Sequence, residues 1–282
     1  MADNELGLML RVQRESVQPA EVGLPAGPRR RALGLRRSEV AMLAGVSVEY
    51  LTRLEQGRDR RPSPEVVSAL ATALQMTSRQ RIRLYQLTKA DSGFQCVEQW
   101  RVVRDVRPEL RTILQMLEPA SAVIVNRLTE VLAYTPTFRA LTEPAGLFDD
   151  GEPPCLARYV FTDPRARELY LDWDAAADKL VASLKEGPFR ADSHIAGLVD
   201  ELTVTGGAEF TRRIEQLPGL AATSGVGRMG HPRVGEFRLR FEMLSVPAEE
   251  DQHLIVHIPA DDAAAAAMDR LAGRRAGGLR AV

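Results

Sequence analysis

The stretch from Leu35 to Gly57 constrains the fold of this chain more than any other. Its apolar residues recur at helical spacing on both sides of Gly45. Ser47 is suited to cap the second of the two segments, and Gly57 is suited to end it. Two short helices joined by a tight glycine turn form a helix-turn-helix pattern.

Further helices are indicated on both sides of this pattern. Apolar spacing predicts a helix over residues 4–16, and Ser63-Pro64-Glu65 combines a capping side chain, a proline for the first turn and an acid. Thr77 to Gln80 has the spacing of a capping box. Residues 1–90 are therefore expected to form an all-helical domain of about five helices.

The charges are distributed unevenly along the chain. Residues 1–90 hold 15 lysines and arginines against nine aspartates and glutamates, whereas the remaining residues hold 22 against 29, and the net charge is −1. A basic first third indicates a polyanionic partner. The sequence shows no apolar run of about 20 residues, no signal-peptide pattern and only two cysteines. These features predict a cytoplasmic protein that does not enter a membrane.

The rest of the sequence combines helical patterns with β-like runs, unlike residues 1–90. Residues 91–107 read as a linker, and residues 108–282 as a second domain that starts with a helix over 108–118. Asp163-Pro164 is expected to start one long helix that continues to Leu184. Early β-like runs at 122–125 and 130–134 and late ones at 237–243 and 254–258 predict one antiparallel sheet with helices over a face, which is an α+β domain. Two helices over 194–202 and 209–217, and a last one over 263–271, complete the pattern.

Both halves resemble a known family. The segment LGLRRSEVAMLAGVSVEYLTRLEQG (33–57) resembles the helix-turn-helix of Xre/Cro-like bacterial regulators, and its flanks resemble the MmyB-like subgroup. The second half resembles the C-terminal domain of that subgroup at Phe161-Thr162-Asp163-Pro164, Leu171-Asp172-Trp173, Glu209-Phe210 and His231 to Glu236. The resemblance implies a DNA-binding domain followed by a PAS-like domain that holds a fatty-acid-like or otherwise apolar ligand. The chain departs from the family pattern at Ser38, Tyr134-Thr135 and Gly207-Ala208.

Candidate DNA contacts follow from how such a motif docks. A recognition helix enters the major groove of double-stranded DNA with its N-terminal residues at the base edges, and arginines around it bind phosphates. Glu49 suits a cytosine amino group, Arg53 a guanine edge and Val48 a thymine methyl group. The predicted contacts are Arg29, Arg30, Arg31, Arg37, Ser47, Val48, Glu49, Tyr50, Arg53, Arg58, Arg60 and Arg61. Alternatively, Val48 and Tyr50 pack inside the domain, Glu49 pairs with Arg53, and Arg60 and Arg61 are solvated charges.

Candidate ligand contacts in the second domain are mostly aromatic. An apolar pocket needs an apolar lining and few polar groups, and His231 or Arg158 would serve a head group. The predicted lining is Leu132, Tyr134, Phe138, Phe148, Arg158, Tyr159, Phe161, Trp173, His231 and Phe241. In the alternative interpretation these aromatic residues are ordinary core, and the domain only oligomerises or binds a protein partner without any ligand.

Motifs for catalysis and metal binding are weak. His253 and His257 would lie on one strand face, but no further metal ligands are evident, and Cys155 is expected to be buried rather than catalytic. We therefore expect no metal, no cofactor and no enzymatic activity. The sequence predicts a homodimeric, sequence-specific transcription regulator that senses a small apolar molecule.

Overall fold

The computed structural model describes residues 4–25, 34–90, 102–149, 151–186, 192–246 and 251–274. The chain forms two compact units, one of residues 1–99 and 216–220 and the other of residues 100–215 and 221–282. The predicted contacts Arg29, Arg30 and Arg31 lie outside the described residues, as do residues 91–101 of the predicted linker.

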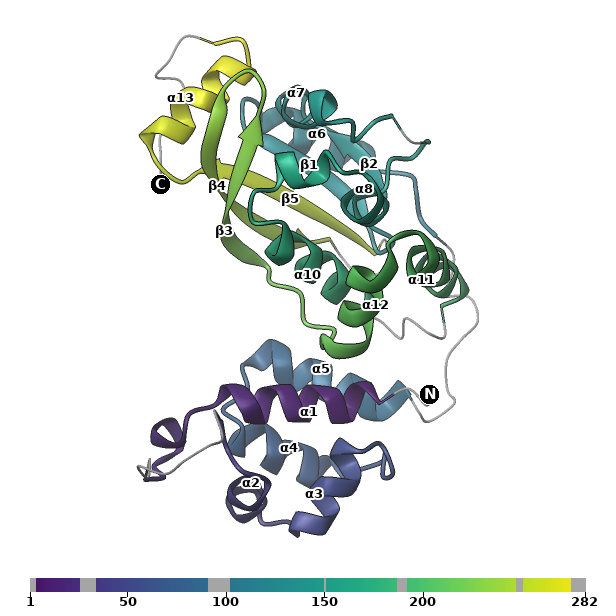
Figure 1. Cartoon of the computed structure of the whole chain (residues 1–282), viewed down its shortest axis with the longest axis vertical. Helices are drawn as coiled ribbons and strands as arrows, with labels where there is room; N and C mark the ends of the chain where they lie inside the picture. The colour runs from purple at the N-terminus through teal and green to yellow at the C-terminus, as the bar shows by residue number, and fades with distance from the viewer. Residues whose placement is uncertain are drawn as a thin grey trace. The chain divides into compact units, whose positions relative to one another are not determined.

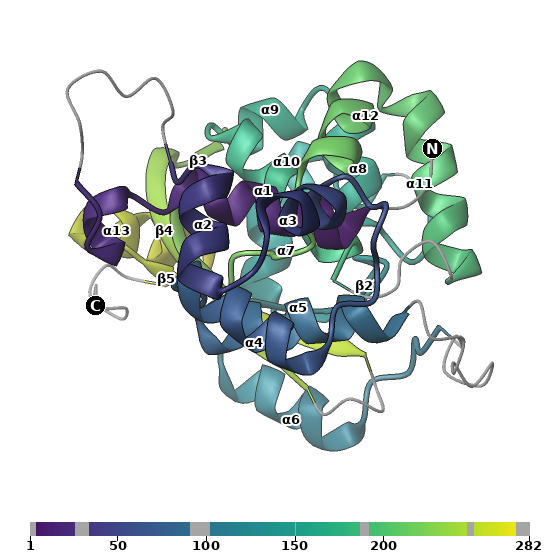
Figure 2. The same ribbon diagram turned by 90° about the horizontal axis from the view of Figure 1, so that it is seen from below.

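The N-terminal unit is helical. Its core is apolar and includes Leu10, Leu51 and Leu70, each almost completely buried. The helices α2 and α3 lie side by side in both views (Figure 1, Figure 2). The elements of this unit are α1 (Glu5–Ser16), the 3-10 helix η1 (Pro19–Val22), α2 (Arg37–Ala44), α3 (Val48–Glu55), α4 (Pro64–Ala73) and α5 (Ser78–Ala90).

Capping residues fix where these helices begin and end. The Ser47 hydroxyl accepts a hydrogen bond from the Tyr50 backbone N–H at 3.1 Å, and Ser63 caps α4 in the same way. Gly45, between α2 and α3, has a φ of 65°, the left-handed conformation that glycine adopts without strain. The predicted helix-turn-helix is thus confirmed in its two helices, its turn and its cap.

The second unit is built on a five-stranded antiparallel sheet. The strand order is β2-β1-β5-β4-β3, so β1 lies between the other early strand and the last strand of the chain. Ile124 pairs with Leu254, and Phe241 pairs with His257. The strands are β1 (Ser121–Asn126), β2 (Val131–Tyr134), β3 (Ser224–His231), β4 (Gly235–Ser245) and β5 (Gln252–Pro259).

Helices pack on both faces of the sheet. The larger core lies on one face, where α7, α8, α9, α10 and α13 contribute apolar side chains (Figure 1). The opposite face carries a smaller core in which Leu114 of α6 packs near Ile124 and Leu254. The helices of this unit are α6 (Pro108–Met116), α7 (Pro136–Thr142), the 3-10 helix η3 (Glu143–Ala145), α8 (Leu156–Thr162), α9 (Ala166–Leu169), α10 (Trp173–Leu184), α11 (Ser193–Thr205), α12 (Gly207–Gln216) and α13 (Asp262–Leu271).

The long helix expected after Asp163-Pro164 is wrong, because the chain breaks into α9 and α10. Tyr170 is extended, with φ −99° and ψ 93°, and forms an antiparallel bridge to Met229 of β3. The Leu171 N–H also donates to the Arg228 carbonyl at 3.1 Å. Backbone pairing with an edge strand therefore interrupts the helical pattern at this point.

None of the helices in the described residues is both long and apolar enough to span a bilayer.

Candidate DNA-binding surface and candidate ligand site

The exposed side of α3 carries the side chains predicted to reach base edges. Val48, Glu49 and Arg53 are exposed, whereas Leu51, Leu54 and Glu55 are buried against the rest of the unit. The helix therefore has one face fixed in the core and one face open. Ser47, at the cap, has its hydroxyl bound to the backbone and is also exposed at the start of the helix.

Two of the predicted contacts interact with each other on this face. Tyr50 is half-buried and packs against the core, and the guanidinium of Arg53 lies 5.4 Å from the centroid of its ring. Arg53 is also 3.9 Å from a carboxylate oxygen of Asp59, not in an ion pair with Glu49. Within the described part of the chain, Glu49 forms no ion pair, so its carboxylate is open to an external donor.

A buried ion-pair network holds α3 from behind. Glu55 is completely buried and accepts hydrogen bonds from Arg14 Nε at 2.7 Å and from Arg37 Nε at 2.8 Å. Because Arg14 lies on α1 and Arg37 on α2, one carboxylate ties three helices together. Arg37 was predicted to contact DNA; its Nε is bound inside the unit, while its side chain stays 42% exposed. Sequence reasoning missed Arg14 and Glu55, although Glu55 follows Leu51 at helical spacing on the apolar side.

The predicted phosphate-binding arginines follow α3. Arg58 and Arg61 are exposed, and Arg60 is half-buried with its Nε donating to the Gly57 carbonyl at 3.0 Å. That bond fixes the backbone just after α3. Arg60 is therefore partly committed to the fold of this loop, which favours the exposed Arg58 as an outward charge.

The predicted ligand residues do not line one common pocket. Leu132 packs with α6 on the opposite face of the sheet from the large core. Arg158 forms an ion pair with Glu201 at 2.6 Å on the helical side. His231 uses both ring nitrogens, with Nε2 3.1 Å from the Ala140 carbonyl and Nδ1 accepting from the Arg233 N–H. These three side chains have structural partners that explain their positions.

The other seven predicted residues belong to the large core or pack against it. They are Tyr134, Phe138, Phe148, Tyr159, Phe161, Trp173 and Phe241. Tyr134 contacts Phe148 with ring centroids 5.0 Å apart and Phe138 at 6.1 Å. Burial raises the pKa of Tyr159, whose hydroxyl donates to the Ala145 carbonyl at 2.9 Å. The face of the sheet that carries the larger core is thus where an apolar ligand would find an aromatic lining.

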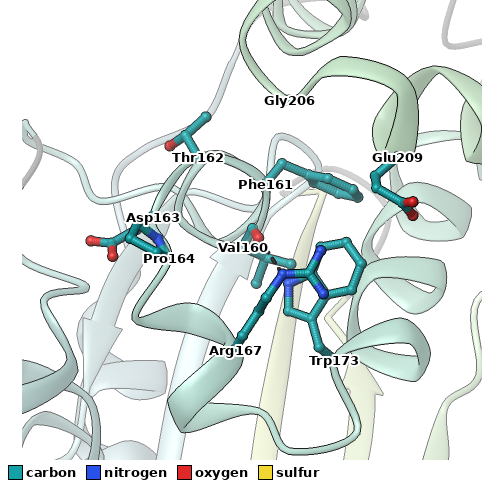
Figure 3. A pocket seen from close by; sticks show the side chains of 9 residues that line it. All are labelled: Val160, Phe161, Thr162, Asp163, Pro164, Arg167, Trp173, Gly206 and Glu209. Atoms are coloured by element: carbon teal, nitrogen blue, oxygen red, sulfur yellow. Dashed lines mark hydrogen bonds between the residues drawn. The ribbon is translucent and has the colours of Figure 1, made fainter.

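A shallow pocket of this unit is lined by residues of α8, α9, α10 and α12 and of the segments that join them. It has a volume of about 190 Å³, and Figure 3 shows its lining residues. Trp173 donates from Nε1 to the Val160 carbonyl at 3.0 Å, and the Arg167 guanidinium lies 3.6 Å from the centroid of its ring system. The lining consists of Val160, Phe161, Thr162, Asp163, Pro164, Arg167, Trp173, Gly206 and Glu209.

The charges around this pocket are mostly paired. Asp163 binds the guanidinium of Arg165, and Glu209 binds those of Arg212 and Arg213. Arg167 has the Trp173 ring as its contact and forms no ion pair with any described residue. Phe161 and Trp173 are the two predicted ligand residues that the pocket brings together.

Comparison with known protein families accounts for both units. Residues 5–84 match a helix-turn-helix domain family, and residues 106–271 match the ligand-binding domain of MmyB-like transcription regulators. The chain belongs to the MmyB-like transcription regulators. This confirms the resemblance drawn from the sequence in both halves. No curated protein matches the chain.

The regulator therefore combines a DNA-binding helix-turn-helix domain with a ligand-binding domain. Within the described residues, no group of three or more histidine, cysteine, aspartate or glutamate side chains has a metal-binding arrangement. Cys155 is buried, and its thiol lies 3.4 Å from the Leu128 carbonyl.

Proposed function

We propose that this MmyB-like regulator reads a specific DNA sequence by placing α3 in the major groove. The observation that carries the proposal is the two-sided character of α3: its buried side is tied to α1 and α2 through Glu55, and its open side presents Val48, Glu49 and Arg53. A helix held in this way inserts its exposed side chains without reorganising. Glu49 accepts from a cytosine amino group, and Arg53 donates to a guanine edge.

Selection of binding sites from random DNA tests base readout. We expect Glu49→Ala and Arg53→Ala each to lose preference at one position of the selected site, with about 1–3 kcal/mol of discrimination lost per contact. Arg58→Ala is the matched control, because a phosphate contact weakens binding equally for all sequences. Uniform weakening by Arg53→Ala would assign this side chain to the DNA backbone instead.

The proposed signal is a fatty-acid-like, apolar ligand in the C-terminal domain of a homodimer. Two recognition helices must stand about 34 Å apart to enter successive major grooves, so a ligand that alters their spacing alters DNA affinity. It acts only if it binds the competent and incompetent arrangements with different affinity. The family of the domain and the aromatic cluster around Tyr134 support this assignment.

The size of the shallow pocket favours an alternative, a C-terminal domain that oligomerises or binds a partner protein without ligand. At about 190 Å³ the pocket is smaller than the roughly 300–1,000 Å³ of ordinary ligand sites. Mass spectrometry of the purified protein, under native conditions and after solvent extraction, distinguishes a ligand-sensing domain from one that works without ligand. A retained acyl chain supports the sensor, whereas DNA binding that no added apolar compound changes supports the alternative.

A further inference from the structure

One lysine of α10 points at the sheet instead of at solvent. The Nζ of Lys179 lies 3.9 Å from the centroid of the Phe241 ring on β4. Phe241 is paired in register with His257 of the neighbouring strand, so the two side chains share the face that carries the larger core. Lys179, Phe241 and His257 are each only partly exposed. A cation thus lies between the helical layer and the sheet, against an aromatic ring.

Among the residues that the structure describes, this cation has no counter-charge. No described residue forms an ion pair with Lys179, and the neighbouring group that faces it from β5 is a histidine. Burial and the charge of Lys179 together lower the pKa of His257 to about 4, so the imidazole is neutral at pH 7. Its Nδ1 is 3.2 Å from the Ser121 hydroxyl. Burial also lowers the pKa of Lys179 to about 8, which still leaves most of the amine protonated at pH 7.

Two recessed arginines of this unit, by contrast, are paired with carboxylates. Arg127 binds Asp192 at 2.5 Å, and Arg213 binds Asp178 at 2.7 Å. An ammonium withdrawn from water without such a partner is destabilising, and a ring contact of the Phe241 kind offsets only about 0.5–2 kcal/mol. The side chain is therefore placed to receive an anion from outside the chain.

We propose that Lys179 receives the acidic head group of the ligand, and that the ligand is an amphiphilic monocarboxylic acid whose apolar part lies along the Phe241 side of the sheet. This rests on the proposed function, since it assumes that the domain binds an apolar small molecule. One ammonium beside a neutral imidazole balances one negative charge. A phosphate monoester, with nearly two charges and more acceptors, would leave charge uncompensated in a recessed place.

The test uses the full-length protein with dodecanoate and, as its uncharged counterpart, 1-dodecanol, both below micellar concentrations. Calorimetric titration should show that the wild type binds the acid at least ten-fold more tightly than the alcohol. Lys179→Met should remove this preference while its affinity for the alcohol stays within about three-fold. Retained alcohol binding also shows that the variant is folded.

Arg167→Met is the matched control, because Arg167 is likewise stacked on an aromatic ring without an ion pair but lies at the shallow pocket. It should keep the preference for the acid. Loss of the preference in Arg167→Met, or its survival in Lys179→Met, overturns the assignment of Lys179. Equal binding of acid and alcohol by the wild type would contradict the proposal that the ligand has an acidic head group. It would leave unchanged the proposal that the domain binds an apolar ligand. Binding of neither compound refutes the fatty-acid-like ligand, and the role of Lys179 with it.

A second measurement does not depend on affinity. With dodecanoate labelled at its carboxyl carbon, nuclear magnetic resonance reports the pKa of the bound acid. An adjacent ammonium should hold this pKa below that of the free acid in the wild type, and Lys179→Met should raise it above that of the free acid. The same carboxyl pKa in both proteins would place the head group elsewhere.

Discussion

At the scale of single residues, the carboxylate of Glu55 holds α3 in place against α1 and α2. Removing this carboxylate leaves Arg14, whose side chain is only 10% exposed, with the exposed carboxylate of Glu15 at 3.1 Å in place of a buried partner. Breaking a buried ion pair from one side costs about 3–5 kcal/mol. We therefore expect Glu55→Ala to reduce the free energy of unfolding by that amount and to weaken DNA binding at all sequences.

The measurement is urea unfolding of the full-length chain, followed by DNA titration at a temperature where the variant is folded. Glu49→Ala is the control on the same helix, because Glu49 is exposed and should change stability by no more than about 0.5 kcal/mol. Equal stability of the two variants would show that the carboxylate of Glu55 contributes nothing to holding α3.

The charge of Lys179 should be visible in the pH dependence of stability. Its folded pKa of about 8 lies below the value of roughly 10.4 in an unfolded chain, so folding disfavours the protonated form. The resulting penalty is fully present below pH 8 and disappears as the pH rises toward 10.4. Ligand-free Lys179→Met should therefore melt above the wild type at pH 7, and the difference should shrink by pH 10. A difference that stays constant over this range would contradict a recessed, unpaired ammonium.

At the scale of elements, β3 depends on a glycine that permits close backbone approach. A Cβ atom at Gly230 would lie 2.2 Å from the carbonyl oxygen of Glu168 in α9, whereas one at Gly227 of the same strand would meet nothing within 4 Å. Gly230→Ala should push α9 from the strand and lower the free energy of unfolding by about 1–3 kcal/mol. Urea unfolding checks this, with Gly227→Ala as the control that should be neutral or slightly stabilising.

The elements that the sequence predicts well are those with local causes. Ser47, Ser63 and Gly45 act within a few residues, and their helices begin and end where the caps indicate. The break at Tyr170 has a distant cause, a backbone bridge to Met229. β3 itself was not predicted, because its glycines give no alternation of apolar and polar residues.

The same distinction applies to the candidate sites. The open face of α3 follows from helical periodicity, so Val48, Glu49 and Arg53 were identified from the sequence. One partner of Glu55, Arg14, lies 41 residues away on another helix, and the contact between Lys179 and Phe241 joins α10 to β4. Pairings across a fold of this kind leave no local pattern, so the sequence identifies neither Glu55 nor Lys179, and the head-group roles of Arg158 and His231 stay predictions.

At the scale of the whole molecule, the basic and the acidic parts of the chain correspond to its two domains. The basic first ninety residues include the helix-turn-helix domain, and the acidic remainder includes the ligand-binding domain. A basic surface raises the rate and the affinity with which DNA is bound, and an acidic one does not compete for phosphates. Salt dependence is therefore the whole-molecule property that reports which arginines bind DNA.

Removing one arginine–phosphate contact should change the salt dependence of DNA affinity by a fixed amount. Each neutralised phosphate contributes about 0.9 to the slope of log affinity against log salt concentration, because bound counterions are released. Arg58→Ala, at an exposed site directly after α3, should thus lower the slope by about 0.9 while leaving the selected sequence unchanged.

The control is Arg139→Ala, since Arg139 is an exposed arginine of the ligand-binding domain paired with Glu143 at 2.6 Å. Fluorescence anisotropy titrations from about 50 to 200 mM salt measure both slopes. An Arg58→Ala slope equal to that of the wild type would remove this side chain from the DNA interface, whereas an Arg139→Ala slope that also falls would place part of the phosphate contact in the second unit.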